Sequence, residues 1–504
     1  MRTGHLPWRS GRGRTAGPRE AGNGSGAAEL MQMRILSRTS LWYIFTLVGV
    51  SAGMLAACSR PQTAAGPGLL PATPIASAHL SNGDGATILS PSLGRNVLVR
   101  VSVDRGALVP APNRAWSMVP GTLHAAFVPP LRAGDDAQSG VRLTLTYPRD
   151  RTAAIGTAHA PLVTVRYADG RELRWLAAAR FDAAQHRVTA DLPSALLDNA
   201  TGITLALGVD NPQVRMEQPG PRYWDGKIWS KQGSIAANKK TVVLIHGIFS
   251  SVETAFPTPA PKSKEVPCPQ RIAKAGGFEQ VLGFDYAWNE PPKTEGPLFA
   301  DFLKKVVDAK VSSLSVEAHS YGSVVSLAAI PKVSGDVNIS NVVTLGGPLP
   351  LRGTPLANED NHWRMGLILG LLDQYSDEPP SVVDRAFKSG MVASLATNSP
   401  ELQQILTDVK GMTNQPHFVE VAGTKWICFV SVYGSCLVSE ETFKKVLVDG
   451  SGVTLPWDGV VEKLAANSSD LPNPIAKDFA LSHVDLECSD AVINWAGQQI
   501  GQNS

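Results

Sequence analysis

The chain has 504 residues, of which 43% are hydrophobic and 18% charged, and its formal net charge is +2. This length allows two or three domains, and this composition excludes a largely disordered chain. Residues 1–57 hold seven basic and two acidic residues, which leaves 39 basic and 42 acidic residues in the remainder. That balance gives no reason to expect a nucleic-acid partner.

Residues 1–57 are predicted to be an N-terminal extension and an export signal. Arg34 and Arg38 stand before an apolar run over 41–57, which ends in Leu-Ala-Ala directly before Cys58. Basic, then apolar, then small residues are typical of a secretory signal peptide. The end of the run resembles the lipobox of bacterial lipoproteins. The alternatives are a transmembrane anchor, for which the run is rather short, and a soluble-secretion signal.

That resemblance implies that Cys58 becomes the lipidated first residue of the mature protein, bound to a membrane through its lipid anchor. Ser59 follows the cysteine, and in Gram-negative lipoproteins this favours the outer membrane. We therefore expect an exported protein, an outer-membrane lipoprotein of a Gram-negative bacterium. Residues 58–90 are rich in Pro, Ala, Gly and Ser, which predicts a flexible tether.

Residues 91–215 carry short segments of alternating apolar and polar residues, without helical patterns between them. The clearest of these segments are 96–103, 141–147, 162–167, 186–191 and 203–207. They predict a small antiparallel β-sandwich domain. No catalytic pattern lies in it, and its role stays open between a spacer, a partner-binding module and a module that presents substrate. A linker rich in Pro, Gly and Trp is expected over 216–237.

The pattern changes in residues 238–504. Five apolar or β-branched residues over 241–245 predict a buried strand of a parallel sheet, and it ends at His246-Gly247. Helical patterns then alternate with further predicted strands, at 280–288, 341–347 and 418–424. This order predicts an α/β domain with a mostly parallel central sheet.

The segment Ala318-His319-Ser320-Tyr321-Gly322 has the small-x-Ser-x-Gly spacing of a nucleophile elbow. A short predicted strand precedes it, and apolar residues at helical spacing follow it. Small residues are needed at 318 and 322 because the turn is so sharp that bulky side chains would collide. The turn pushes out the serine hydroxyl and lets the N–H of Tyr321 face a developing oxyanion. The alternative is an ordinary helix start with Ser320 as N-cap.

A strand that ends in His-Gly, followed downstream by the serine elbow, resembles the α/β-hydrolase superfamily. Within it, the resemblance is to bacterial lipases and esterases and to GPI inositol-deacylase-like lipases, over roughly residues 240–500. It implies an α/β-hydrolase fold and an oxyanion hole made by the N–H groups of Ile248 and Tyr321. It also implies that His246 supports the loop and is not the base. Ala318 stands where the common pattern has Gly, as it does in some bacterial lipases.

The base is expected to be His483. A serine hydroxyl needs a base to take its proton, and in this fold the base is the last of the three residues in the chain. Three histidines follow Ser320. His362 lies in an insertion and His417 leads into a strand, whereas His483-Val-Asp resembles the His-x-Asp surroundings of lipases, before a last predicted helix.

The acid is expected to be Asp458, because Asp458-Gly-Val-Val matches the Asp-Gly-Val-Val loop of lipases. Asp449, which also precedes a glycine, and Glu420 are rivals. The alternative for either Asp-Gly pair is a plain turn.

Two interpretations of the apolar insertion at about 351–398 stay open. Its apolar residues include Trp363, Met365, Ile368 and Leu369. They form either a lid over an acyl pocket or a helical segment that packs on the core.

With Cys58 set aside, four cysteines remain: Cys268, Cys428, Cys436 and Cys488. An even set in an exported protein predicts disulfides. Cys428 and Cys436 flank a predicted hairpin turn, so this bond is favoured, and Cys268 and Cys488 would remain as a second pair. The spacing lacks the His or Cys-x-x-Cys companions of a zinc site, so no metal is expected.

Together these patterns predict a serine hydrolase that cleaves carboxylic esters, a lipase or esterase. It would act through an acyl-enzyme intermediate with the triad Ser320, Asp458 and His483, without a cofactor. The expected substrate is a small-molecule or lipid ester. The alternatives are an acyltransferase or amidase on the same triad, and a surface lipoprotein that acts mainly as a binding module.

Overall fold

The structure is a computed structural model. It describes residues 76–502 except 90–96, 112–113, 133–138, 148–158, 177, 183, 212, 214–218, 260–262, 264, 334–338, 350–352, 360–363, 366–367, 370–377, 427–430, 433–434, 437–439, 449–450, 454, 459 and 468–469. The predictions for residues 1–75, including lipidation at Cys58, therefore lie outside the described residues.

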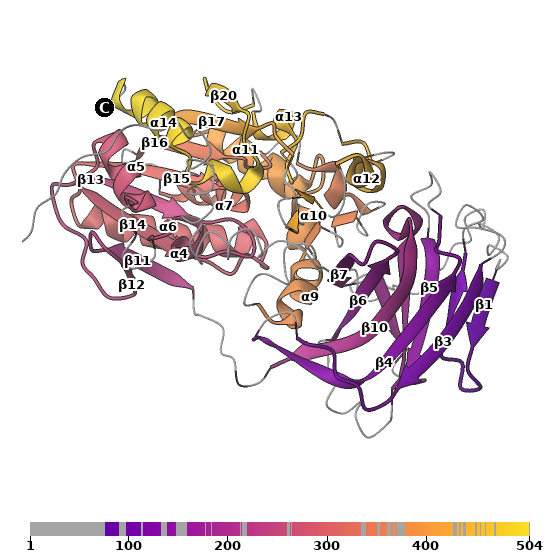
Figure 1. Cartoon of the computed structure of the whole chain (residues 1–504). Helices are drawn as coiled ribbons and strands as arrows, with labels where there is room; N and C mark the ends of the chain where they lie inside the picture. Colours follow the sequence, from indigo (N-terminus) through magenta and orange to yellow (C-terminus); the bar gives the residue numbers. More distant parts are fainter. Residues whose placement is uncertain are drawn as a thin grey trace, which may run out of the picture.

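Residues 76–210 form two five-stranded antiparallel sheets (Figure 1). The first has the order β1-β2-β5-β9-β8, with strands at Ala76–His79, Gly85–Ile88, Ser139–Thr146, Arg187–Pro193 and Ala178–Asp182. The second has the order β3-β4-β10-β6-β7, with strands at Leu98–Asp104, Trp116–Val128, Ala200–Asp210, His159–Tyr167 and Glu172–Leu176.

Each of these sheets buries one face, because successive side chains of a strand point to opposite sides. In β5 the buried side chains are Val141, Leu143 and Leu145, and in β4 they include Leu123 and Phe127. All five belong to one apolar cluster. The alternating segments of the sequence correspond to these strands, in which every second side chain faces the apolar core.

The tether expected over 58–90 ends too late, because β1 and β2 lie within it. Ala86 and Ile88 of β2 are buried, and β2 pairs along its whole length with β5. These two strands are four residues long, too short for their alternation to stand out in a stretch rich in Ala and Gly.

The linker expected over 216–237 is also wrong in part. It contains β11 (Gly220–Trp224) and β12 (Trp229–Ser230), the outer strands of the large sheet. Trp229 is buried and donates its Nε1–H to the carbonyl of Phe256 at 3.0 Å. Arg222 is buried in an ion pair with Asp285. Tertiary contacts therefore outweigh the Pro and Gly content of this segment.

The large sheet has eight strands in the order β12-β11-β14-β13-β15-β16-β17-β20. β11 runs antiparallel to both of its neighbours, whereas the strands from β14 to β20 are mutually parallel. Their bounds are β13 Lys240–Ile245, β14 Gln280–Asp285, β15 Ser313–His319, β16 Ile339–Leu345, β17 His417–Gly423 and β20 Ile475–Phe479. The hairpin β18–β19 joins Ser431–Val432 to Ser435–Cys436.

Helices cover both faces of this sheet (Figure 1). On one side lie α6 (Pro292–Asp308), α7 (Tyr321–Ala329) and α11 (Pro400–Lys410), whose buried residues share a cluster. On the other lie α5 (Cys268–Gly276) and α14 (Asp490–Gln502). Shorter elements are η3 Ser194–Leu197, α4 Val252–Ala255, η4 Ile330–Lys332, η5 Pro355–Ala357, α10 Met391–Ser394, α12 Glu440–Phe443, η7 Lys444–Val448, α13 Lys463–Ala466 and η8 His483–Leu486. Within the described part of the chain, no helix combines the length and the apolar character that a membrane span needs.

The insertion at 351–398 is described only in part. Its Met365, Ile368 and Leu369 are buried in the main apolar cluster, so these three side chains pack on the core. Helix α9 (Pro380–Lys388) lies against β6 and β10 of the second small sheet (Figure 1). The insertion therefore joins the two halves of the molecule.

A disulfide between Cys268 and Cys488 ties the start of α5 to the segment before α14. This is the pair that the sequence left over once Cys428 was matched with Cys436. Cys428 lies outside the described residues, so the structure does not test the second bond.

We expect the double substitution Cys268→Ala with Cys488→Ala to lower the free energy of unfolding by about 2–5 kcal/mol. The bond closes a loop of sequence separation 220, and its loss gives the unfolded chain more freedom. Urea unfolding followed by tryptophan fluorescence measures this. An unfolding midpoint equal to that of the unaltered protein would contradict the bond.

Candidate active site

Ser320 lies at the turn from β15 into α7, at the carboxyl edge of the parallel strands. Its backbone has φ 52° and ψ −128°, which is rare for any residue other than glycine. The turn is held by a hydrogen bond from the Ser320 N–H to the carbonyl of Leu345 at 2.8 Å. The residue is only 4% exposed, so its hydroxyl is nearly closed to solvent in this conformation.

Gly322 shows why the motif needs a small residue two places after the serine. A Cβ at this position would lie 2.2 Å from the carbonyl oxygen of His246. Helix α7 thus starts directly under the end of β13, with no room for a side chain. The steric argument made from the sequence applies at this residue.

The end of β13 supplies the other side of the site. A Cβ on Gly247 would lie 2.8 Å from the Cβ of Ser320 and 3.4 Å from its Oγ. The next residue, Ile248, is therefore beside the hydroxyl and is partly exposed. The N–H of Tyr321 belongs to the first turn of α7, where N–H groups have no partner within the helix. The backbone segments of Ile248 and Tyr321 thus lie on either side of Ser320.

His246 holds this loop in place. Its Nδ1 is 2.7 Å from the carbonyl oxygen of Gly247, and its Nε2 accepts the N–H of Tyr286 at 3.3 Å. A ring that donates at one nitrogen and accepts at the other is neutral. Burial lowers the pKa of His246 and favours the same state. Its two nitrogens are both engaged, so it is a structural histidine.

Asp285, at the end of β14, completes the support of the loop. Its Oδ1 accepts the N–H of Val252 at 2.7 Å, at the first residue of α4, while Arg222 compensates its buried charge. The side chain of Phe249 then packs on Trp288, with ring centroids 4.1 Å apart. The loop after β13 is therefore fixed from both sides.

The structure brings Asp458 and His483 together. The Nδ1–H of His483 donates to Oδ2 of Asp458 at 2.8 Å, and Oδ1 of Asp458 accepts the N–H groups of Val460 and Val461 at 2.9 and 2.7 Å. Asp458 is fully buried and His483 is 4% exposed. Asp458 thus accepts three hydrogen bonds, and the bond to Nδ1 leaves Nε2 of His483 as the nitrogen available to another group.

His483 lies next to the serine turn. A Cβ on Gly346 would be 3.1 Å from Nδ1 of His483, and one on the adjacent Gly347 would be 3.3 Å from the carbonyl oxygen of Ser320. The Nε2 atom of His483 is buried and has no hydrogen-bond partner among the described residues. No hydrogen bond joins this atom to the Ser320 hydroxyl in the described structure. Such bonds commonly tighten only when substrate binds.

The rival residues are placed differently. Glu420 is buried on β17, and burial raises its pKa to about 8, so it is neutral at pH 7. His417 begins β17, at the opposite end of the parallel strands and about 20 Å from the serine edge for a seven-residue strand. Asp449 and His362 lie outside the described residues.

Sequence reasoning missed a second buried histidine–carboxylate pair. His319 has its Nδ1 2.7 Å from Oε1 of Glu487, and its Nε2 is 3.1 Å from the carbonyl oxygen of His483. The rings of His319 and His483 have centroids 4.8 Å apart. His319 stands inside the serine motif, but nothing in the sequence connects it to Glu487.

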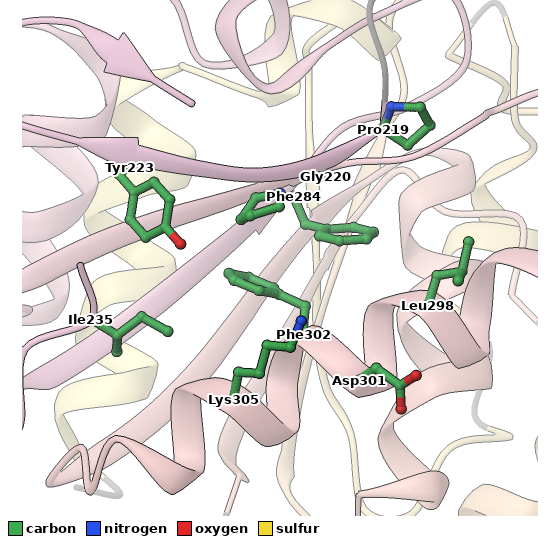
Figure 2. A pocket seen from close by; sticks show the side chains of 10 residues that line it. Pro219, Gly220, Tyr223, Ile235, Phe284, Leu298, Asp301, Phe302 and Lys305 are labelled. Carbon is green, nitrogen blue, oxygen red and sulfur yellow. The ribbon is translucent and has the colours of Figure 1, made fainter. Parts of the chain in front are cut away.

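A separate cavity of about 370 Å³ lies between β11 and α6 (Figure 2). Phe284, Leu298, Phe302 and Tyr223 supply much of its wall, with Asp301 and Lys305 at α6. None of Ser320, Asp458, His483, Ile248 and Tyr321 lines it. Among the residues that the structure describes, no group of three or more His, Cys, Asp or Glu side chains is placed to hold a metal ion.

No protein-family model and no curated protein matches this chain. Solved structures do. The Bacillus licheniformis lipase BlEst2 in its mature form is 18% identical, covering 54% of this chain and 94% of that chain, with a TM-score of 0.36. A hydrolase from Oleispira antarctica is 12% identical, covering 53% and 93%, with a TM-score of 0.31. The Pyrococcus furiosus esterase Pf2001 is 15% identical, covering 53% and 81%, with a TM-score of 0.28. At such TM-scores the likeness carries no weight for function, which has to follow from the side chains above.

We expect Gly322→Ala to lower the free energy of unfolding by about 1–3 kcal/mol, because the methyl group collides with the His246 carbonyl. The matched control is Gly501→Ala in α14, where a Cβ meets nothing within 4 Å. Thermal unfolding of both variants measures the difference. Equal stability of the two variants would show that the turn has more space than described.

Proposed function

We propose that this protein is a serine hydrolase of the α/β-hydrolase type that cleaves carboxylic esters, as a lipase or esterase. One observation carries the proposal: the hydrogen-bonded pair of Asp458 and His483 lies beside Ser320, whose backbone is held in a strained turn. A carboxylate that fixes an imidazole, with the free nitrogen next to a serine, is the arrangement that activates a hydroxyl as a nucleophile.

The proposed reaction starts with attack of Ser320 Oγ on the ester carbonyl while Nε2 of His483 takes the hydroxyl proton. Asp458 accepts the Nδ1–H throughout and stabilises the imidazolium. The N–H groups of Ile248 and Tyr321 hold the oxyanion. His483 then returns the proton to the leaving alcohol, and an acyl-enzyme on Ser320 remains. Water, deprotonated by the same imidazole, releases the acid.

The proposed domain organisation follows the sheets. A β-sandwich domain over 91–215, with β1 and β2 added at its start, precedes an α/β-hydrolase domain over 238–504 that carries the insertion at 351–398. The strands β11 and β12 extend the hydrolase sheet from the segment before it. What supports this division is that no strand pairs between the two parts of the described chain.

We expect Ser320→Ala and His483→Ala each to lower kcat by about 10⁶, and Asp458→Asn by about 10⁴, because the triad acts as a unit. Hydrolysis of a chromogenic short-chain ester measures this. Glu420→Gln is the matched control for the acid, since a neutral buried carboxyl loses little on becoming an amide. A Glu420→Gln variant as impaired as Asp458→Asn would move the acid to position 420.

Acyl transfer and amide cleavage are the alternatives on the same machinery, because different nucleophiles compete for one acyl-enzyme. A surface lipoprotein that mainly binds a partner is the alternative of another class. A fluorophosphonate probe separates the classes: labelling at Ser320 supports an enzyme, and its absence supports the binding module. A panel of esters and amides of rising acyl length then separates esterase, lipase and amidase.

We further propose that the mature protein is exported and begins at a lipidated Cys58, as an outer-membrane lipoprotein, and that Cys428 and Cys436 form a disulfide. Support for the first comes from the signal-like residues before Cys58. For the second it is the short hairpin β18–β19, which turns between the two cysteines.

Mass spectrometry of the membrane-extracted protein is expected to find a lipid-modified Cys58 at the N-terminus, because processing would remove the residues before it. An unmodified Cys58, or retained residues before it, would overturn the proposed lipid anchor.

Non-reducing peptide mapping is expected to join the peptides of Cys428 and Cys436. A free thiol at Cys428 would overturn this disulfide and would leave the bond between Cys268 and Cys488 unaffected.

A further inference from the structure

We propose that His319 and Glu487 are positioning residues for the reaction: they hold the main chain of His483 so that its imidazole faces Ser320. The inference rests on the proposed function, and it concerns a pair of side chains that takes no part in the chemistry itself. The pair is buried, with side chains 5% and 7% exposed.

The main chain of His483 is fixed at both ends. Its N–H donates to the carbonyl of Asp458 at 3.2 Å, and its carbonyl oxygen is 3.1 Å from Nε2 of His319. His483 is the first residue of the short turn η8, which could otherwise shift as a unit. His319 directly precedes Ser320, so this contact ties the base to the strand that carries the nucleophile.

The proton count defines the state of the pair. A carbonyl oxygen only accepts, so Nε2 of His319 must carry a proton. Nδ1 lies 2.7 Å from Oε1 of Glu487, in an ion-pair contact that lacks hydrogen-bond geometry. A carboxylate this close to the ring favours its charged form, so His319 is an imidazolium beside a carboxylate.

The charges around His319 agree with this state. Burial alone would lower the pKa of His319, but the carboxylate of Glu487, the His483 carbonyl and the Asp458 carboxylate together raise it above its ordinary value. The other ionisable groups near His319 are His246, which is neutral, and Glu317, whose pKa is raised by burial to about 8.

A disulfide at the next residue holds the main chain of Glu487 in place. The next residue, Cys488, is bonded to Cys268 at the start of α5. The chain of contacts thus runs from a covalent bond through Glu487 and His319 to the carbonyl of His483. A buried ion pair can serve stability alone, so the test needs a readout that stability does not change.

The first readout is kcat per active site. In the variant His319→Leu with Glu487→Gln, no unpaired charge is left buried, but the His483 carbonyl loses its donor. We expect kcat to fall about ten- to a hundredfold, with KM changed less than about twofold, because a small misalignment of the base acts on the chemical step. Fluorophosphonate titration of Ser320 gives the concentration of active sites, so partial unfolding is not counted as lost kcat.

Asp485→Asn is the matched control. It removes a carboxylate from the same turn, but Asp485 is exposed and accepts from Ser482 Oγ, away from His319. A kcat of the double variant within about twofold of this control would overturn the proposal. The titration also separates a failure of the positioning role from a failure of the proposed function. If the unaltered protein neither reacts with the probe nor hydrolyses esters, the proposed function itself is contradicted.

The second readout is the pH profile of Glu487→Gln. In the unaltered protein His319 is protonated below its raised pKa and loses that charge as pH rises through it. The neutral ring then keeps its remaining proton on Nδ1, which faces the Glu487 carboxylate, and no longer donates to the His483 carbonyl, so kcat should fall on the alkaline side. In Glu487→Gln the amide donates to Nδ1 of a neutral His319, which still donates to the His483 carbonyl, so this alkaline fall should disappear. This test stands even if the double variant does not fold. An alkaline limb that is the same in both proteins would overturn the proposal.

Discussion

The turn at Ser320 is the constraint on which the rest of the site depends. A positive φ at a residue with a side chain costs on the order of 1–3 kcal/mol, and here it persists because both flanking elements are locked into the core. β15 is buried between β13 and β16, and every residue of α7 is buried. Because Gly322 lies so close to the His246 carbonyl, only a sharp turn can connect β15 to α7 here. The strain is a consequence of packing, and it leaves the hydroxyl between two loops.

Three buried carboxyl groups show that the surroundings of a carboxyl group decide what it can do. Glu317 and Glu420 sit in the strands themselves, where burial raises the pKa of each to about 8. Asp458 is buried as deeply but lies in the turn before α13, whose N–H groups point at it. A strand directs its own N–H groups to its neighbours, whereas a turn can lend them to a side chain. The acid of a triad is therefore expected in a turn and not within a strand.

The sequence was informative where one local pattern decides the structure. The continuous apolar run before His246 gave β13, and the Ser-x-Gly spacing gave the turn at Ser320. It failed where partners far apart in the chain decide. β20 was missed because its side chains are mostly exposed, and it is a strand only through its pairing with β17. The contact between His319 and Glu487 has no local pattern at all, since each residue has an ordinary place in its own segment.

The second small sheet contacts α9, and hydrogen bonds continue from α9 to the site. Asp210 accepts the N–H of Ser381 at 2.9 Å at the start of α9, and Trp116 donates to the carbonyl of Glu378 at 3.2 Å. On its other side, the carbonyl of Val382 accepts the side-chain amide of Asn289 at 3.3 Å.

Next to Asn289, the carbonyl of Glu290 accepts the hydroxyl of Tyr321 at 2.7 Å. Tyr321 is the residue whose N–H faces the proposed oxyanion. The path from Asp210 to Tyr321 consists of hydrogen bonds between part-buried groups. A contact made by β10 is therefore connected through α9 and the loop after β14 to the residue that directly follows Ser320.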